Sequence, residues 1–479
     1  MSQQNSLSDI VSSTLSSSFR DPSGFLFEAN GKIYRQINLS YQANYEALMS
    51  SGAYKSLSEE GLLIQHTEVD PEDPSTLSPA HYKTILPTQL PYVSYPYEWS
   101  FSQLKDAALL TLRVQSVALQ HGMILKDASA YNVQFMDGNP IFIDSLSFET
   151  YEDNQPWVAY RQFCQHFLAP LALITHTDYR LAQLLKIYID GVPLDLTSKL
   201  LPVRSWFNYS LLAHIHLHAS AQRRHQDDGR SKDSPTRATA NFSRAQLQGL
   251  ISSLQAAVQR LQPKYAATEW GDYYADTNYI DSADQHKQDL VTMFLGNVKP
   301  EQIKTVADYG ANTGKFSRLA ADTGAHVLSF DIDEVAVDKN YRATRQSQEK
   351  NILPLLLDLT NPSPALGWAS EERMSFLERG PADVGMALAL IHHIAISNNV
   401  PLARCAKLFS QLCHHLIIEF VPKEDSQVAR LLATREDIFV DYHKQGFEEA
   451  FAVYFETIDS VAVRDSDRTL YLLRKRAAG

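Results

Sequence analysis

The sequence predicts a two-domain α/β protein, with a doubly wound parallel sheet in the C-terminal half and an α+β domain in the N-terminal half. Two observations predict this organisation. After about residue 299, apolar strand patterns alternate with helical patterns, which is typical of parallel strands joined by crossover helices. Before it, a polar stretch at 222–242 with Gly, Pro and many charges interrupts the periodicity and indicates a linker.

The composition fits a globular chain of two or three domains. Of the 479 residues, 44% are hydrophobic and 20% are charged, and no apolar run approaches the roughly 18 to 20 residues that a membrane helix needs. The formal net charge is −12 without a long Lys/Arg block, which argues against binding to bulk nucleic acid. Three cysteines without a C-x-x-C pair, and the absence of a secretory signal, predict a cytoplasmic protein with reduced thiols.

The first 18 residues are rich in Ser and Gln and predict a disordered tail, which places the N-terminal domain at 19–221. Residues 24–37 predict a β-hairpin, with its turn at Ala-Asn-Gly. The other elements predicted in this domain are a strand at 92–99 and helices at 41–49, 102–120, 157–174 (broken near Pro170) and 179–189.

A motif-like stretch follows the long predicted helix of this domain. Asp127 and Asn132 have the spacing D-x-x-x-x-N, Asp137-Gly138 predicts a hairpin, and an apolar strand ends at Asp144. With His121-Gly122 before it, the stretch resembles the catalytic loop and metal-binding strand of the protein-kinase-like fold. The resemblance implies that Asp127 orients or deprotonates a hydroxyl, while Asn132 and Asp144 hold magnesium against nucleotide phosphates.

The stretch also departs from the protein-kinase pattern. Leu125-Lys126 replaces His-Arg, Asp144 is followed by Ser-Leu in place of Phe-Gly, and the hairpin at 24–37 has no G-x-G-x-x-G loop. Small-molecule kinases of this superfamily often lack the last two features. Arg35 lies roughly where the nucleotide-binding lysine is expected, with Glu46 as a conceivable partner. An active kinase, a pseudokinase and a partner-binding module therefore all stay open.

Three histidines, His214, His216 and His218, alternate along the chain and raise the alternative of a metal site. On a strand they would share one face, but their neighbours fit a helix equally well, and no carboxylate lies at ligand spacing. We predict no metal site there.

The C-terminal domain starts with a strand, a turn and a helix at 306–316. The strand runs into Asp308, and Gly310, Asn312 and Gly314 follow at alternate positions. A dinucleotide fold spaces its glycines as G-x-G-x-x-G, so the third glycine comes one residue too early for that cofactor. The stretch resembles motif I, D-x-G-x-G-x-G, of class I S-adenosylmethionine (SAM)-dependent methyltransferases. Asn312 replaces the middle glycine, and Asn tolerates a left-handed backbone. An ordinary turn of another doubly wound sheet is the alternative.

The elements around this motif fit the same resemblance. Helical patterns at 243–262 and 287–295 flank an aromatic stretch at 269–279, and 243–298 resembles the cap that closes over SAM in many methyltransferases; the aromatic residues fit packing at the domain edge equally well. Seven strands ending in a meander match the Rossmann-like class I sheet over 299–479, with helical patterns between the first five. The strands are predicted at 305–309, 326–331, 352–358, 383–390, 415–420, 452–458 and 469–473.

Strand-terminal acids supply the cofactor contacts that the resemblance implies. Asp308 corresponds to the acid near the methionine amino group, and Asp358 to the acid near the adenine amino group. Asp331 corresponds to the carboxylate that accepts hydrogen bonds from both ribose hydroxyls. Asp333 is predicted to cap the next helix.

Acceptor chemistry is predicted at the ends of the fourth and fifth strands. His392 or His393 is a candidate general base, since histidine has a suitable pKa, although Leu-x-His-His also recurs as a structural turn. Glu419 is a further candidate beside the substrate. The stretch from Leu390 to Glu424 resembles methyltransferases of the nodulation-protein NoeA-like group.

The leading hypothesis is therefore a SAM-dependent methyltransferase with an accessory kinase-like domain and an unidentified methyl acceptor, either a small molecule or a protein. A magnesium nucleotide is a further cofactor of the N-terminal domain under this hypothesis. The alternatives are that the N-terminal domain sets the function, as a phosphotransferase or a partner-binding module, or that the chain is a noncatalytic SAM-binding regulator.

Overall fold

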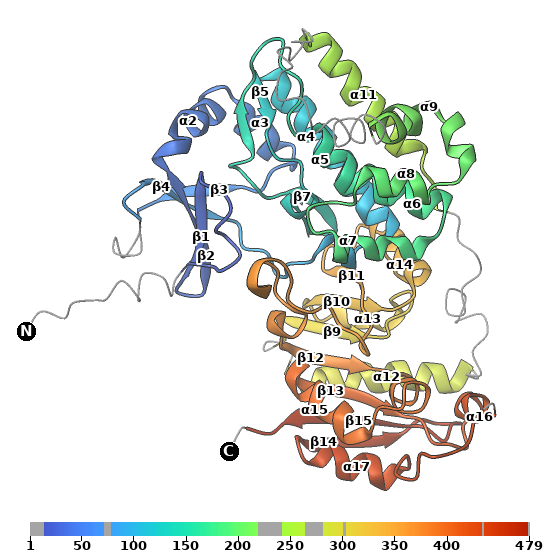
Figure 1. Cartoon of the computed structure of the whole chain (residues 1–479). Helices are drawn as coiled ribbons and strands as arrows, with labels where there is room; N and C mark the ends of the chain where they lie inside the picture. Colours follow the sequence, from blue (N-terminus) through green and yellow to red (C-terminus); the bar gives the residue numbers. More distant parts are fainter. Residues whose placement is uncertain are drawn as a thin grey trace, which may run out of the picture. The chain divides into compact units, whose positions relative to one another are not determined.

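The structure is a computed structural model, and it divides the chain into two compact units (Figure 1). Unit 1 comprises residues 1–97, 101–264 and 367–373, and unit 2 comprises 98–100, 265–366 and 374–479. Apart from Phe242, the predicted linker lies outside the described residues, as does the aromatic stretch at 269–279. The described residues are 14–70, 78–218, 242–263, 281–299, 303–433 and 435–477.

Unit 1 begins with a four-stranded antiparallel sheet. Asn30 and Gly31 have φ angles of 51° and 70°, as in a two-residue hairpin turn, which confirms the hairpin. The predicted tail is wrong for residues 14–18, because the Leu15 amide donates to the Leu26 carbonyl at 2.9 Å. The strands, in spatial order, are β1 (Gly24–Ala29), β2 (Lys32–Asn38), β4 (His81–Pro87) and β3 (His66–Val69).

The rest of unit 1 is mainly helical. The strand predicted at 92–99 is wrong, since the structure has only the short turn η3 (Pro96–Glu98) there. Among the described residues, none of the helices is both long and apolar enough to cross a membrane. The helices and helical turns are η1 (Leu39–Tyr41), α2 (Gln42–Ser50), α3 (Ala53–Glu59), α4 (Phe101–Gln120), α5 (Tyr160–Phe163), η5 (Cys164–Leu168), α6 (Ala169–His176), η6 (Tyr179–Gln183), α7 (Leu184–Ile187), α8 (Leu194–Leu200), η7 (Val203–Phe207), α9 (Tyr209–Leu211), η8 (Leu212–His216) and α11 (Arg244–Arg260).

The D-x-x-x-x-N stretch is held by two small antiparallel strand pairs. Asp137 and Gly138 have φ angles of 51° and 71°, which confirms the predicted hairpin. The strand predicted to end at Asp144 ends two residues earlier, so Asp144 lies in the loop that follows. The pairs are β5 (Met123–Leu125) with β8 (Phe148–Thr150), and β6 (Val133–Met136) with β7 (Asn139–Phe142); η4 (Ala130–Asn132) precedes β6.

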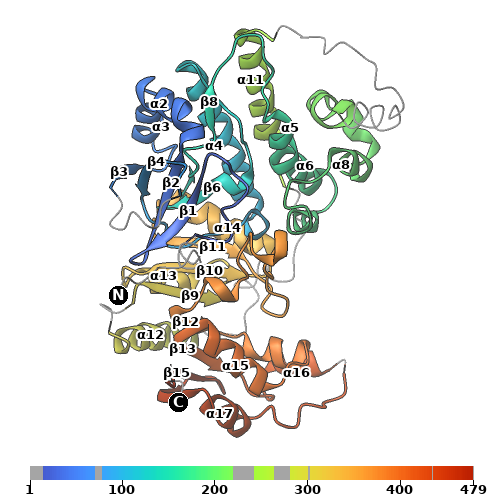
Figure 2. The same ribbon diagram turned by 60° about the vertical axis from the view of Figure 1, so that its left-hand side comes forward.

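The predicted cap at 243–298 is wrong in its first half, because α11 belongs to unit 1 and packs against α4 (Figure 2). Lys105 of α4 donates to the carbonyls of Gln259 and Leu261 at 2.9 and 2.8 Å. The helical pattern was correct, but periodicity does not say which domain an apolar face covers. Only α12 (Asp281–Asn297) lies in unit 2.

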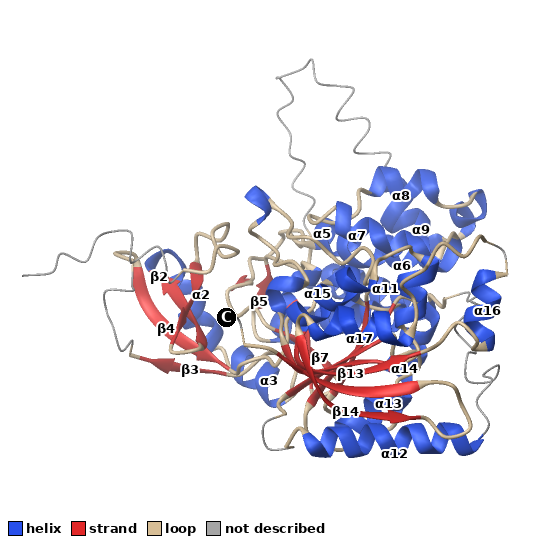
Figure 3. Ribbon diagram, turned by 90° about the horizontal axis from the view of Figure 1, so that it is seen from below, coloured by secondary structure: helices blue, strands red, loops and turns tan. Residues whose placement is uncertain are grey.

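Unit 2 is built on a seven-stranded sheet with helices on both faces (Figure 3). Its first five strands are parallel, in the spatial order β11-β10-β9-β12-β13, and β15 pairs antiparallel with both β13 and β14. This confirms the predicted α/β fold. The strands are β9 (Thr305–Tyr309), β10 (His326–Asp331), β11 (Ile352–Leu356), β12 (Ala382–Ala387), β13 (Cys413–Phe420), β14 (Phe455–Ala462) and β15 (Thr469–Lys475).

The connections between these strands agree with the prediction only in part. Helices follow β9, β10 and β12 as predicted, and β14 leads into β15 without a helix. Between β11 and β12, where every residue is described, only the short turns η11 and η12 occur. Two unpredicted helices lie between β13 and β14. The elements are α13 (Lys315–Ala321), α14 (Glu334–Gln346), η11 (Trp368–Ser370), η12 (Leu377–Arg379), η13 (His393–Ser397), α15 (Leu402–Leu412), α16 (Ser426–Leu432) and α17 (Lys444–Ala452).

Replacing Gly314 by alanine is expected to reduce the stability of unit 2 by about 2 to 3 kcal/mol. The φ of 82° strains any L residue, and a Cβ would run into the side chain of Asn340, whose amide donates to Ser329 Oγ at 2.9 Å. Gly324→Ala is the matched control, because its φ is 86° but nothing lies within 4 Å of the added Cβ. It should lose only about 1 kcal/mol. Hydrogen exchange of the β9 and β10 amides measures both losses, and equal losses would contradict the packing role.

Candidate functional site

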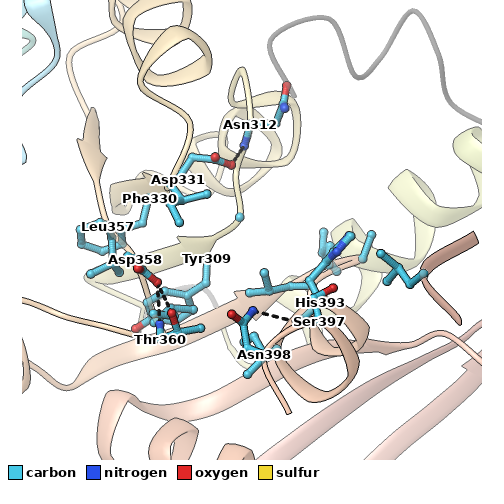
Figure 4. Close-up of a pocket in the computed structure, with 18 residues that line it drawn as sticks. Tyr309, Asn312, Phe330, Asp331, Leu357, Asp358, Thr360, His393, Ser397 and Asn398 are labelled. Atoms are coloured by element: carbon cyan, nitrogen blue, oxygen red, sulfur yellow. Dashed lines mark hydrogen bonds between the residues drawn. The ribbon is translucent and has the colours of Figure 1, made fainter. Parts of the chain in front are cut away.

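A cavity of about 420 Å³ lies at the carboxyl ends of the parallel strands of unit 2 (Figure 4). Its walls come from the ends of β9 and β10, the segments that follow β9, β10, β11 and β12, the turn η13, and Leu431 of α16. The position next to β9 and β12 is where the strand order reverses, and open α/β sheets bind their ligands at this point. The topology therefore brings together side chains from five separate stretches of sequence.

The turn after β9 forms one wall, and its backbone is left-handed at three alternate positions. Gly310, Asn312 and Gly314 have φ angles of 79°, 51° and 82°, so Asn312 has the left-handed backbone that glycine adopts most readily. A Cβ on Gly310 would lie 3.3 Å from Leu390 Cδ1, so the turn packs closely against the segment after β12. Gly310 and Asn312 line the cavity. Gly314 does not, and it instead starts α13 beside Asn340.

Asp331 ends β10 and connects this turn to the next helix. Its Oδ2 accepts a hydrogen bond from the Asn312 amide at 2.7 Å, and its Oδ1 accepts one from the Asp333 amide at 2.8 Å. Burial raises the pKa of Asp331 to about 6, although these backbone donors oppose the shift. The backbone of Ile332 opposes the shift as well. A carboxylate has about four acceptor positions, so Asp331 keeps acceptor capacity for a ligand in the cavity. Asp333 caps α14 as predicted.

Asp308 is placed differently from the prediction. It is 2% exposed, its Oδ2 accepts a hydrogen bond from Ser317 Oγ at 2.7 Å, and it does not line the cavity. Burial, together with the negative charge of Asp331, raises its pKa to about 7. The neighbouring Tyr309 faces the cavity instead. Asp308 therefore supports the turn from beneath, and its predicted direct contact with a ligand is corrected.

Asp358 lies on the cavity wall after β11, where apolar residues that were not predicted from the sequence also line the cavity. Its Oδ1 accepts hydrogen bonds from the amide and hydroxyl of Thr360 at 2.8 and 2.6 Å. Ile332 and Leu359 also line the cavity, and Ile332 is 59% exposed. An apolar residue directly after a strand-terminal acid is the sequence signal that would have identified Ile332. The two side chains provide apolar surface on which a flat ring can pack.

The two adjacent histidines have different surroundings. His393 lines the cavity, whereas His392 is 2% exposed, does not line it, and has no hydrogen-bond partner at Nδ1. Burial is the main cause that lowers the pKa of His393 to about 4, so its imidazole is neutral near pH 7. His393 begins the π-helical turn η13, and such turns occur frequently at functional sites. Of the two candidates, His393 is the one that can accept a proton from a molecule in the cavity.

Glu419 is not available as a base, which corrects the prediction. Its side chain is fully buried and does not line the cavity. Its Oε2 accepts hydrogen bonds from Lys287 Nζ at 2.6 Å and from the Ala389 amide at 2.7 Å. The carboxylate is therefore committed to a buried lysine and to the backbone behind the cavity wall.

In unit 1, the side chains of the D-x-x-x-x-N stretch converge. Asn132 donates to Ser147 Oγ at 3.1 Å, and Ser147 donates to Asp144 Oδ2 at 2.6 Å. Burial raises the pKa of Asp127, the charge of Asp144 adds to this shift, and hydrogen bonds from the backbone of Ser129 and the side chains of Gln162 and Asn132 oppose it. The three predicted residues thus form one half-buried polar cluster.

Arg35 belongs to the same cluster, but not with the predicted partner. Its Nη1 lies 2.6 Å from Asp144 Oδ1, and its Nη2 lies 3.3 Å from Asp21 Oδ2. Glu46 instead accepts hydrogen bonds from Gln42 and Tyr82, both at 2.8 Å. The proposed pairing of Arg35 with Glu46 is therefore wrong, and Arg35 neutralises Asp144.

The histidines of η8 bind hydroxyl groups. His214 contacts Tyr160 Oη at 2.8 Å and Ser253 Oγ at 3.0 Å, and His216 contacts Ser198 and Ser205 at 2.8 and 2.9 Å. In the part of the chain that is described, no three His, Cys, Asp or Glu side chains are grouped to hold a metal ion.

Comparison with solved structures gives partial and distant likenesses. WbdD, described elsewhere as a bifunctional kinase-methyltransferase, is 17% identical with a TM-score of 0.30, and the match covers 39% of each chain. Magnesium protoporphyrin IX methyltransferase (ChlM) from Synechocystis PCC 6803, with bound S-adenosylhomocysteine (SAH), is 17% identical with a TM-score of 0.31. That match covers 42% of this chain and 91% of ChlM. No protein-family model matches the chain.

Comparison of sequences gives a relative over nearly the whole length. The nodulation protein NoeA of Rhizobium meliloti (strain 1021) is 37% identical over 466 residues, which cover 96% of this chain and 95% of NoeA. The likeness therefore extends over both units. The chain therefore belongs to the family of the nodulation protein NoeA.

Proposed function

We propose that unit 2 is a SAM-dependent methyltransferase that transfers a methyl group to an unidentified acceptor. The observation that carries the proposal is the cavity itself, where the left-handed turn, Asp331 and Asp358 meet at the carboxyl ends of three consecutive strands opposite His393. In this assignment the turn at Gly310 lets the backbone approach the methionine part of SAM, and Asp331 accepts hydrogen bonds from the ribose hydroxyls. Ile332 and Leu359 pack against the adenine ring, and Asp358 accepts a hydrogen bond from the adenine amino group.

The chain's own residues contribute positioning and a proton acceptor. SAM supplies a methyl group on a sulfonium, which moves to a nucleophile by in-line displacement. The cavity walls hold the reacting groups in line and exclude water, which is the main requirement for this chemistry. If the acceptor nucleophile carries a proton, His393 is placed to accept it as a neutral imidazole.

Asp331→Ala is expected to weaken SAH or SAM binding by about thirty- to a thousandfold, because two charge-assisted hydrogen bonds to ribose are lost. Asp358→Ala should lose less, since adenine also packs on Ile332 and Leu359. Isothermal titration calorimetry on the full chain measures both. An unchanged dissociation constant for Asp331→Ala would refute the assignment.

The affinity of the wild type should also fall as the pH drops through about 6. Protonation of Asp331, whose pKa is raised to about 6, removes the charged acceptor, so the ionised form present at higher pH is the one that binds. Asp331→Asn cannot titrate at this position and should have a flatter affinity profile between pH 5 and 8, measured by the same titration.

His393→Ala is expected to lower turnover by about a hundred- to ten-thousandfold with little change in SAM affinity, as for the loss of a general base. His392→Ala is the control, because His392 does not line the cavity. At saturating SAM, wild-type turnover should fall as the pH drops through about 4, where the imidazole becomes charged. Incorporation of labelled methyl groups from SAM into a cell extract measures both effects. Full turnover by His393→Ala would make the residue structural.

A second candidate function concerns unit 1, where we infer a site for a magnesium nucleotide. The supporting observation is the cluster of Asp127, Asn132 and Asp144, whose oxygen atoms are the kind of ligand that magnesium prefers. Arg35, paired to Asp144, adds a cation able to contact phosphates. The tight turn at Asn30-Gly31 provides no glycine-rich loop over the phosphates, so binding should be weak. If phosphoryl transfer occurs, Asp127 is the residue expected to orient the hydroxyl.

A thermal-shift titration of the full chain with ATP and magnesium tests this second candidate. Millimolar ligand should raise the melting temperature, since a ligand that binds the folded state stabilises it by mass action. The shift should disappear in Asp144→Asn and persist in Asp331→Ala, which separates the unit 1 site from the cavity of unit 2. A shift that persists in Asp144→Asn would refute the assignment, and no shift in the wild type would leave a scaffold or partner-binding role for unit 1.

A further inference from the structure

The face of α12 that packs on the sheet contains one charged residue among apolar ones. Ala283, Leu290, Val291 and Phe294 are buried on this face, and Lys287 occupies the position between them. The Lys287 side chain is 3% exposed, and its Nζ lies 5.0 Å from the centre of the Phe316 ring. A charged group at such a position is costly unless it is paired, so its partner identifies what it does.

The partner is Glu419, and the pairing does not end there. Lys287 Nζ donates to Glu419 Oε2 at 2.6 Å, and the same oxygen accepts a hydrogen bond from the Ala389 amide at 2.7 Å. The other carboxylate oxygen, Oε1, lies 3.7 Å from Arg468 Nη1, and Arg468 is also paired with Asp425 at 2.8 Å. One carboxylate oxygen therefore connects a helix on the face of the sheet with the backbone that follows β12.

The backbone at Ala389 needs this support. Ala389 has a φ of 51°, which is unfavourable for a residue with a Cβ by about 1 kcal/mol. This turn aims Leu390 at the cavity, where its Cδ1 lies 3.3 Å from the position of a Cβ on Gly310. Leu388, Ala389 and Leu390 together form the wall opposite the glycine turn. A relaxed φ at Ala389 would move that wall.

We infer that Lys287 and Glu419 are positioning residues for the cavity: the ammonium fixes the carboxylate, and the carboxylate holds the strained Ala389 turn in the conformation that fits the cofactor. This inference rests on the proposed function, since the cofactor is the molecule whose fit is measured. Neither side chain lines the cavity, so neither contacts the ligand directly.

The test compares two charge-free replacements that differ in one hydrogen-bond acceptor. In the double variant Lys287→Met with Glu419→Gln, the amide oxygen can still accept from Ala389. In the double variant Lys287→Met with Glu419→Leu, methyl groups replace that oxygen, and the Ala389 amide loses its acceptor. Removing both charges together avoids an unpaired buried ion, which is the usual reason that such variants fail to fold. SAH is the probe, and calorimetry on the full chain gives its dissociation constant, with circular dichroism confirming the fold.

The glutamine variant should bind SAH within about threefold of the wild type, and the leucine variant at least about tenfold more weakly. The single variant Lys287→Met should also bind more weakly, because the freed carboxylate can turn toward Arg468. The matched control replaces another buried ion pair of unit 2, Arg379 with Glu98, by methionine and glutamine; neither residue lines the cavity, so SAH affinity should be unchanged.

The outcomes separate the two proposals. If the wild type does not bind SAH, the proposed function fails. If the wild type binds it and the folded glutamine and leucine variants bind equally well, the cofactor assignment stands and the positioning role is wrong. A folded Lys287→Met that binds like the wild type would likewise overturn the role of Lys287.

Discussion

The hydrogen bond from the Asn312 amide to Asp331 is the interaction on which the geometry of unit 2 depends. It connects the left-handed turn after β9 to the end of β10, and the second oxygen of the same carboxylate accepts the Asp333 amide at the start of α14. One buried carboxylate thus fixes two strand ends and a helix start at the point where the strand order reverses. Because its oxygen atoms keep free lone pairs, the group that organises the site also remains able to bind a ligand.

The strands of unit 2 were largely predictable because each is a short apolar run with a clear end. β9 and β10 have the predicted bounds, since the glycine turn follows β9 directly and the acid Asp331 ends β10. β11 ends earlier than predicted: its last paired residue is Leu356, and the apolar run continues one residue further, to Leu357. The position of α11 was not predictable from its own sequence: its apolar face fits any complementary surface, and contacts distant in sequence decide which one it covers.

The site was predictable in its residue types but not in the direction of every side chain. Asp308 is the penultimate residue of β9 and pairs with Ser329, whereas Tyr309 pairs with Phe330. Successive side chains on a strand point to opposite faces, so a difference of one position turns the acid toward Ser317 and the tyrosine toward the cavity. Motif spacing does not say which face of the strand turns toward the cavity, even where the ends of the strand are predicted correctly. His392 and His393 are also adjacent, but they lie at the start of the helical turn η13, and only His393 lines the cavity.

The pair of Lys287 and Glu419 shows why a buried charge is better explained by position than by stability. Desolvation lowers the pKa of Lys287, so the ammonium is held in an environment that disfavours it and is maintained by its partner. Replacing such a pair with apolar side chains is often neutral or stabilising, which means that stability alone gives no reason to keep it. A carboxylate at this depth does what an apolar side chain cannot: it accepts the Ala389 amide and sustains an unfavourable φ. A buried carboxylate needs a positive partner, and Lys287 provides it from the otherwise apolar face of α12.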